Sequence, residues 1–327
     1  MCTAIAANAD DFYFGRTLDY EFTYGETVTL TPRNYVFDFL SGERVSKHYA
    51  ILGMAHVINN YPLYYDAFNE KGLCMAGLNF VGNAYYNQKS KEKINVAQYE
   101  FIPYILCQCK NVEEAVKLIY KINIVGEEIF SLPIAELHFI IADKNNCITV
   151  EPTREGVKIY ENKVGVLTNN PPFKEQISRL SDFMHLSAEK PKNIFSKNIE
   201  LLPYSRGMGA LGLPGDYSSA SRFVRIAFLK ENSVFEGMEE QKVGQFFHIM
   251  DSVNVSKGSV IENGKCEITV YTSCCNATQG IYYYTTYNNR QITGVSIYND
   301  EIDSNELKKA QLADEQKINV IKEPWQK

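Results

Sequence analysis

Met1-Cys2-Thr3-Ala4-Ile5-Ala6-Ala7 opens the chain, and Phe12-Tyr13-Phe14-Gly15-Arg16-Thr17 follows it after the turn residues Asn8-Ala9-Asp10-Asp11. Short runs of β-prone residues on either side of Asn and Asp are typical of a β-hairpin. The sequence therefore predicts two paired strands at residues 3–7 and 12–17. We expect this pairing to bring Arg16 and the residues around it back beside Cys2.

The rest of the chain alternates between helix and strand patterns. Asn111, with Glu114 three residues later, is typical of a helix N-terminus, and apolar residues recur at helical spacing through residues 112–122. The apolar segment 97–109 predicts another helix, paired with the first as an antiparallel hairpin. Helices are also predicted at residues 221–231 and 242–251, and strands at residues 28–31, 72–80, 137–142, 147–151, 158–161, 165–168, 267–272, 281–287 and 291–297. Since no low-complexity linker or repeat interrupts this order, it predicts one layered α+β domain over residues 1–327.

The composition excludes several classes of protein. The 327 residues carry 33 Lys+Arg against 39 Asp+Glu, a net charge of −6, with no long basic cluster. No nucleic-acid partner is therefore expected, because binding to phosphate backbones needs a basic surface. No segment reaches the run of about 18 apolar residues that a membrane helix needs. The N-terminus also lacks the basic region of an export signal, so we expect a cytoplasmic protein without membrane association.

The cysteines and histidines do not form a recognisable metal site. Without an export signal, the eight cysteines are interpreted as reduced thiols rather than disulfides. Cys107-Gln108-Cys109 and Cys274-Cys275 lack the spacing and the second ligand pair of a zinc site. The five histidines form no HExxH motif, and no catalytic role is predicted for any of them. Because nucleotide-binding and serine-hydrolase motifs are absent too, we expect neither metal nor cofactor.

Cys2 is the candidate nucleophile. It becomes the first residue once Met1 is removed, which we expect, and a thiol and a free α-amine then share one residue. The α-amine has a reference pKa of about 7.7 to 8.0, so part of it is free near pH 7 to accept the thiol proton. Taken alone, Cys2 is better explained as a small residue at the start of a buried strand.

Other polar residues near predicted strand ends strengthen the catalytic interpretation. Asp19 lies three residues after Arg16; its carboxylate would hold the α-amine, and the guanidinium would favour the thiolate. An ordinary surface ion pair is the alternative. Asn79 and Asn169 follow apolar strand residues, from which side-chain amides can stabilise an oxyanion, although asparagine is also a common turn residue. An arginine opening the helical stretch would add positive charge, and spacing alone does not choose between Arg222 and Arg225.

These segments together resemble the choloylglycine hydrolases, which comprise bile salt hydrolases and penicillin V acylases. The resemblance extends over nearly the whole chain. It is carried by Met1-Cys2-Thr3-Ala4-Ile5, Phe14-Gly15-Arg16, Asp19-Tyr20-Glu21, Asn60-Tyr61-Pro62-Leu63-Tyr64-Tyr65-Asp66-Ala67, Asn69-Glu70-Lys71-Gly72-Leu73, Ala76-Gly77-Leu78-Asn79-Phe80, Gly165-Val166-Leu167-Thr168-Asn169-Asn170-Pro171, Gly212-Leu213-Pro214-Gly215-Asp216 and Ser221-Arg222-Phe223-Val224.

The resemblance implies an N-terminal nucleophile hydrolase fold, a four-layer αββα sandwich of two antiparallel sheets between helices, assembled as a homotetramer. It implies that Cys2 is nucleophile and base, that Arg16 and Asp19 support it, and that Asn79 and Asn169 bind the substrate amide and oxyanion. Arg222, rather than Arg225, matches the family position. The implied reaction is acyl transfer to the thiol, release of the amine, and hydrolysis of the thioester.

The resemblance also bears on the substrate. Bile salt hydrolases are similar to this sequence in having Gly-Leu-Asn at Asn79, where several penicillin V acylases carry Tyr, so conjugated bile salts are the expected substrate. Two features depart from the family: Thr17 stands where Asn is usual, and the loop at residues 128–139 is one residue shorter and ends in Phe rather than Trp. An apolar pocket would suit a steroid, and its predicted lining residues are Leu18, Tyr65, Ile129, Phe130 and Leu132.

Two alternatives remain open. A penicillin V acylase, or another N-acyl amide hydrolase, would use the same machinery on a different acyl group. A catalytically silent binding protein would keep the apolar pocket and tolerate an uncleaved Met1, but it would not need all six predicted catalytic residues.

Overall fold

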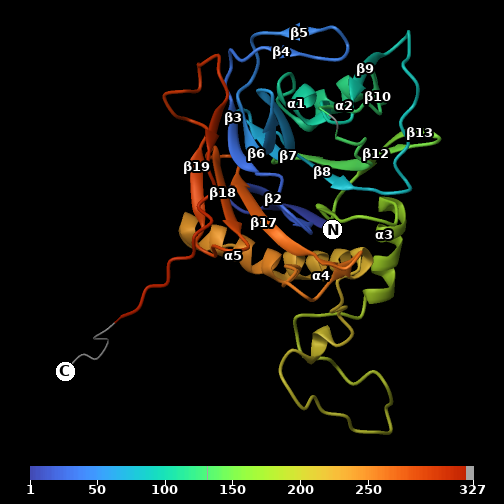
Figure 1. The fold of residues 1–327 in the computed structure, drawn as a ribbon. Helices are drawn as coiled ribbons and strands as arrows, with labels where there is room; N and C mark the ends of the chain where they lie inside the picture. The colour runs from blue at the N-terminus through green and yellow to red at the C-terminus, as the bar shows by residue number, and fades with distance from the viewer. Residues whose placement is uncertain (131, 322–327) are drawn as a thin grey trace.

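The structure is a computed structural model that describes residues 1–130 and 132–321. In these residues two antiparallel sheets lie face to face between helices (Figure 1). The first sheet has the order β14 (Val166–Leu167), β1 (Cys2–Asn8), β2 (Phe12–Tyr20), β17 (Ile268–Asn276), β18 (Ile281–Thr286) and β19 (Thr293–Ser296). The second has the order β13 (Gly156–Glu161), β12 (Cys147–Thr153), β11 (Leu137–Ala142), β8 (Cys74–Asn79), β7 (Tyr61–Asn69), β6 (Ile51–Ile58), β3 (Thr27–Thr31) and β20 (Lys308–Ala310).

Helices cover the outer face of each sheet. Short helices α1 (Phe101–Leu106) and α2 (Val112–Ile119) cover the second sheet, while α4 (Ser219–Asn232) and α5 (Glu239–Asp251) cover the first (Figure 1). Helix α3 (Phe173–Arg179) lies at one side of the sandwich. The small strand pairs are β9 (Ile94–Ala97) with β10 (Ile122–Val125), β4 (Phe37–Asp38) with β5 (Arg44–Val45), and β15 (Ile261–Glu262) with β16 (Lys265–Cys266).

The central strands β8 and β11 of the second sheet are buried on both faces, which explains why they are mainly apolar. On β11, Ile140 and Ala142 pack between the two sheets, whereas Phe139 and Ile141 face the α1–α2 side. The Phe139 ring lies 4.6 Å from that of Phe101 on α1, measured between centroids. Side chains of successive strand residues point to opposite faces, so one strand contributes to two cores. The predicted α+β class and the four-layer αββα sandwich are confirmed.

Most local predictions hold, two need correction, and some elements were missed. The β1–β2 hairpin is confirmed, and Asn111 caps α2 by accepting a hydrogen bond from the Glu114 backbone N–H at 2.9 Å. The helix predicted at residues 97–109 is shorter: Ala97 ends β9, and only Phe101–Leu106 is helical. Residue 122 begins β10, which pairs with β9 in parallel. Strands β6 and β7 and helix α3 were not predicted, because continuous apolar runs and short helices carry little periodicity.

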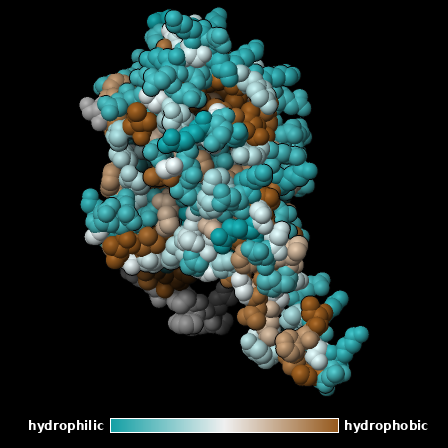
Figure 2. All heavy atoms as spheres, turned by 90° about the vertical axis from the view of Figure 1, so that its right-hand side faces the viewer, coloured by the Kyte–Doolittle hydropathy of each residue, from teal (hydrophilic) through white to brown (hydrophobic). Residues whose placement is uncertain are grey.

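An arm at residues 184–216, between η1 (Leu180–Phe183) and α4, projects from the sandwich (Figure 1). It exposes large hydrophobic side chains, which Figure 2 shows in brown on the projecting segment. Ile194 is 93% exposed, Phe195 81% and Tyr204 83%. In the described residues no helix has the length and hydrophobicity required to span a bilayer.

Candidate active site

The β1–β2 hairpin divides the predicted catalytic residues between its two faces. Cys2 lies opposite Leu18, and Ala4 lies opposite Arg16. Because side chains alternate along a strand, Cys2, Arg16 and Leu18 share one face. These three residues line a cavity of about 470 Å³. The alternate residues, including Asp19, point to the other face, toward α4.

Arg16 extends from β2 to the second sheet, where it is held by backbone carbonyls. Its Nη1 donates to Gly77 O on β8 at 2.6 Å and to Tyr65 O on β7 at 3.2 Å. Its Nη2 is buried and has no hydrogen-bond partner in the described part of the chain. Burial opposes the positive charge, yet electrostatic interaction with ionisable neighbours, among them Asp66 and Asp19, keeps the pKa of Arg16 above its ordinary value. Arg16 therefore lines the cavity with one nitrogen free to donate.

Asn169 and Arg222 both form hydrogen bonds with the backbone of Cys2. Asn169 Oδ1 accepts hydrogen bonds from the Cys2 backbone N–H at 2.9 Å and from Arg222 Nη2 at 2.7 Å. Arg222, fully buried near the start of α4, also donates from Nη1 to Cys2 O and Thr3 Oγ1. Asn169 Nδ2 donates to Asn79 O at 2.8 Å. This network connects the two asparagines, the arginine and the candidate nucleophile.

Asp19 is buried behind Cys2 and does not line the cavity. Its Oδ1 accepts from Thr269 Oγ1 at 2.6 Å and its Oδ2 from Thr17 Oγ1 at 3.2 Å. Burial raises the pKa of Asp19, while the positive N-terminus and Arg222 oppose the rise. Thr17 thus holds Asp19 and lies outside the cavity.

Met1 is present, so the Cys2 nitrogen is a peptide nitrogen and the α-amine belongs to Met1. That amine donates to Asp19 O at 2.8 Å and forms an ion pair with the Glu267 carboxylate. Glu267 is buried, and sequence reasoning did not find it as a site residue. In the sequence, Glu267 is recognisable only as the first residue of a predicted strand. Its partner, the Met1 amine, lies at the opposite end of the chain, so no local pattern connects the two.

His138 supports the segment that carries Asn169. It is completely buried and stacks on Phe80, with 4.3 Å between the ring centroids. Its Nε2 lies 2.8 Å from Thr168 O, and its Nδ1 lies 3.3 Å from Glu151 Oε1. Phe80 and Thr168 each adjoin one of the two predicted catalytic asparagines, so this histidine fixes the backbone beside them.

The predicted substrate-binding residues fall mostly on the cavity wall. Leu18, Tyr65, Ile129 and Leu132 all line it. Phe130 does not: it lies in the turn where Ile129 pairs with Leu132, has a positive φ of 49° and is 43% exposed. The remaining wall is formed largely by apolar and aromatic side chains, including Tyr20, Phe22, Tyr24, Leu63, Tyr64, Val81, Tyr99, Pro133, Ile134, Ala135 and Leu137.

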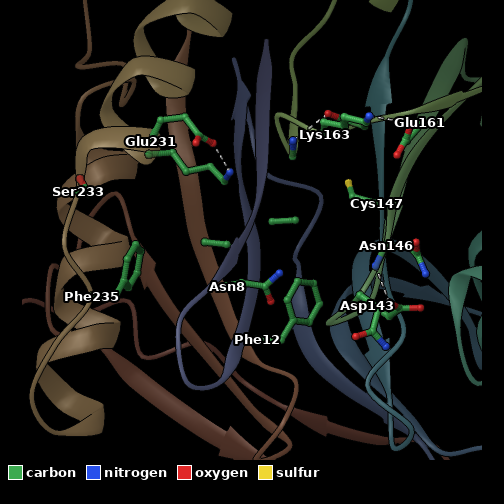
Figure 3. Close-up of a pocket in the computed structure, with 16 residues that line it drawn as sticks. Asn8, Phe12, Asp143, Asn146, Cys147, Glu161, Lys163, Glu231, Ser233 and Phe235 are labelled. Carbon is green, nitrogen blue, oxygen red and sulfur yellow. Dashed lines mark hydrogen bonds and ion pairs between the residues drawn. The ribbon is translucent and has the colours of Figure 1, made fainter. Parts of the chain in front are cut away.

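Another cavity, of about 520 Å³, lies at the opposite end of β1, beside Asn8 (Figure 3). Lys163, Glu161 and Cys147 line it, and burial raises the pKa of the Cys147 thiol to about 12. None of the predicted site residues lines this cavity. Among residues 1–130 and 132–321, no three His, Cys, Asp or Glu side chains cluster as metal ligands would.

The sequence profile of the linear amide C-N hydrolases, choloylglycine hydrolase family, matches residues 2–310. The chain belongs to the choloylglycine hydrolase family. It is therefore a hydrolase of linear amide C–N bonds, and the family resemblance noted in the sequence is confirmed. This choloylglycine hydrolase family member is 49% identical over 309 residues to the "Bile salt hydrolase/transferase" of Lactiplantibacillus plantarum, covering 94% of this chain and 95% of the relative.

Solved structures agree with this family assignment. The C2A mutant of the conjugated bile acid hydrolase from Clostridium perfringens superposes with a TM-score of 0.90 at 32% identity, covering 98% of this chain and 100% of that one. The penicillin V acylase from Agrobacterium tumefaciens has a TM-score of 0.77 at 17% identity, with 96% and 94% covered. The latter likeness establishes the fold alone.

Proposed function

We propose that this choloylglycine hydrolase cleaves the amide bond of glycine- or taurine-conjugated bile salts, yielding free bile acid and amino acid. One observation carries the proposal: a cavity of about 470 Å³ has Cys2, Arg16 and Asn79 together on its wall and is otherwise lined mainly by apolar and aromatic side chains. Such a cavity suits an acyl group that is large and apolar, joined to a polar amide. The names of the Lactiplantibacillus and Clostridium relatives favour the same substrate.

In the proposed mechanism, Cys2 supplies both nucleophile and base. After Met1 is removed, the Cys2 α-amine accepts the thiol proton, and the thiolate attacks the amide carbonyl carbon. The C–N bond then breaks, and the amine leaves with a proton returned by the α-ammonium group. Water hydrolyses the resulting thioester, releasing the bile acid and regenerating the thiol. No cofactor is needed in these steps.

The neighbouring groups have distinct proposed roles. Asn79 and Asn169 donate side-chain N–H groups to the amide oxygen as it becomes an oxyanion. Arg16 Nη2, which is free to donate, favours the thiolate by its charge. Asn169 Oδ1, which accepts from the Cys2 backbone nitrogen, is placed to orient the α-amine once Met1 has left. Arg222 holds the Cys2 backbone by donating to Cys2 O, and the Asp19 carboxylate, whose charge acts on the N-terminus, holds the α-amine.

The first test combines an intact mass with a product assay. We expect the purified protein to lack Met1, and we expect it to release glycine from glycocholate or taurine from taurocholate. A processed N-terminus without release from either conjugate would contradict the bile salt proposal, and phenoxyacetyl hydrolysis would then be assayed with penicillin V. Retention of Met1 together with no release would instead favour the binding-protein alternative.

We also propose that the chain acts as one domain and assembles as a homotetramer. The projecting arm supports self-association, since Ile194, Phe195 and Tyr204 are exposed on it, and clustered exposed apolar side chains are typical of protein interfaces. We expect light scattering to give the mass of four protomers, and Phe195→Ser to reduce it. An unchanged mass for Phe195→Ser would show that this side chain is not part of the interface.

A cytoplasmic location is proposed because all eight cysteines are free thiols.

A further inference from the structure

The wall of the active-site cavity carries a polar pair far from the nucleophile. Glu26 and His56 line the same cavity as Cys2 and Asn79. Asn79 ends β8, His56 lies on β6, and Glu26 immediately precedes β3; the sheet order is β8, β7, β6, β3. Because neighbouring strands are about 4.8 Å apart, His56 lies about 10 Å from Asn79 across the sheet, and Glu26 about 14 Å.

The register of the strands aligns this pair in one row. Thr27 lies opposite Ala55, so the same register places Glu26 opposite His56. His56 lies opposite Leu63 on β7, which lines the cavity as well. The cavity therefore runs across the strands, from the catalytic groups at β8, past apolar side chains on β7, to a polar pair at β6 and β3.

His56 has an unused hydrogen-bonding atom. Its Nδ1 is buried and has no partner in the described part of the chain. Buried polar atoms are normally hydrogen-bonded, so an unpaired nitrogen in a ring that lines a cavity points to a ligand. Burial lowers the pKa of His56, although Glu26 opposes the shift, and the ring is therefore neutral near pH 7. A neutral imidazole can donate from one nitrogen and accept at the other.

Glu26 offers an acceptor beside this ring. It is only 4% exposed, and its Oε1 accepts from the Tyr24 backbone N–H at 3.0 Å and from Tyr65 OH at 3.5 Å. Its Oε2 accepts from Thr23 Oγ1. Since a carboxylate has about four acceptor positions, these three donors leave one position open. The Tyr24 ring lies beside the imidazole, with 5.7 Å between the Tyr24 and His56 ring centroids.

We propose that His56 and Glu26 are specificity-determining residues that hydrogen-bond a ring hydroxyl of the acyl group, at the end furthest from the scissile amide. A hydroxyl fits both partners, because it donates one hydrogen bond and accepts others. This inference rests on the proposed function and deepens it. A hydroxylated steroid places such a group beyond an apolar skeleton, whereas a phenoxyacetyl group is shorter and ends in an unsubstituted ring.

The test compares two glycine conjugates that differ only in ring hydroxyls: glycocholate and the glycine conjugate of 5β-cholanic acid. For His56→Phe we expect KM for glycocholate to rise about tenfold, the loss of roughly one hydrogen bond. We expect kcat to stay within about twofold, because the ring lies far from the reacting carbonyl. For the glycine conjugate of 5β-cholanic acid, we expect His56→Phe to leave KM unchanged. An unchanged kcat for this conjugate would also show that the variant is folded.

Further variants separate hydrogen bonding from cavity shape. His56→Gln keeps an amide in place of the imidazole and should recover part of the affinity for glycocholate, while Glu26→Gln should raise KM for that conjugate only. His248→Phe is the matched control, since His248 is exposed on α5 and does not line the cavity. We expect this control to leave both substrates unaffected.

Two results would overturn the inference, and they are distinguishable. Equal rises in KM for both conjugates in His56→Phe and Glu26→Gln would mean that the pair only shapes the cavity, while the bile salt proposal would stand. Absence of glycine release from both conjugates by the wild-type protein would overturn the proposed function and this inference together.

Discussion

Cys2→Ser is expected to reduce kcat/KM for amide hydrolysis by at least about 1000-fold while leaving the fold intact. A serine hydroxyl ionises far less readily than a thiol, so the α-amine cannot generate an equivalent nucleophile near pH 7. Cys2 is buried, and serine is of similar size, so the β1–β2 pairing should persist. Release of glycine or taurine measures the loss, and thermal unfolding checks the fold.

Cys147→Ser is the matched control for this prediction. Cys147 lines the other cavity, at the far end of β1 (Figure 3), where it contacts none of the proposed machinery. We expect this variant to keep the wild-type rate. If Cys2→Ser retained more than about a tenth of the activity, Cys2 would have to be removed from the mechanism.

Asn79→Ala should lower kcat by on the order of 100-fold, the usual cost of removing one oxyanion donor. Asn79 lines the cavity, and in the described residues its side-chain amide makes no hydrogen bond; its backbone carbonyl instead accepts from Asn169. The alanine variant would keep that backbone contact and lose only the donor. We therefore expect the loss to appear mainly in kcat, measured under substrate saturation.

Asn83→Ala is the corresponding control. Asn83 lies in the turn four residues after Asn79, outside the cavity, and its substitution should leave turnover within about twofold. An unchanged rate in Asn79→Ala would show that the Asn79 side chain is not an oxyanion donor. A rise confined to KM would assign it to ground-state binding of the amide.

The part of the site that lies on the β1–β2 hairpin could be predicted from short-range sequence patterns. The turn at residues 8–11 and the strand pattern on either side of it place Arg16 and Leu18 beside Cys2, and the observed register agrees. A hairpin involves contacts that are close in sequence, so turn chemistry and a two-residue period suffice to predict it. The resemblance to the choloylglycine hydrolases supplied the more distant members, Asn169 and Arg222, which spacing alone did not select.

Other parts of the cavity could not be predicted locally. Phe130 looked equivalent to Ile129 and Leu132 in the sequence, yet Ile129 and Leu132 line the cavity and Phe130 does not. The strand β6 was missed, and with it the position of His56. Both errors have the same cause. The direction of a side chain depends on the backbone conformation and on pairing between strands that are distant in sequence, and neither can be predicted from local composition.

The sequence by itself determined the family and the presence of a cysteine able to become the N-terminal residue, because both depend on residue identity. It also determined the hairpin, because the hairpin contacts join residues within about twenty positions of each other. Only the tertiary structure decided which face of the hairpin each group occupies. It placed Arg16 against the second sheet, Asn169 between Cys2 and Asn79, Arg222 against the Cys2 backbone, and Glu26 beside His56. The packing of two sheets and their helices brings these residues together, since a sheet buried on both faces fixes the direction of every side chain that it carries.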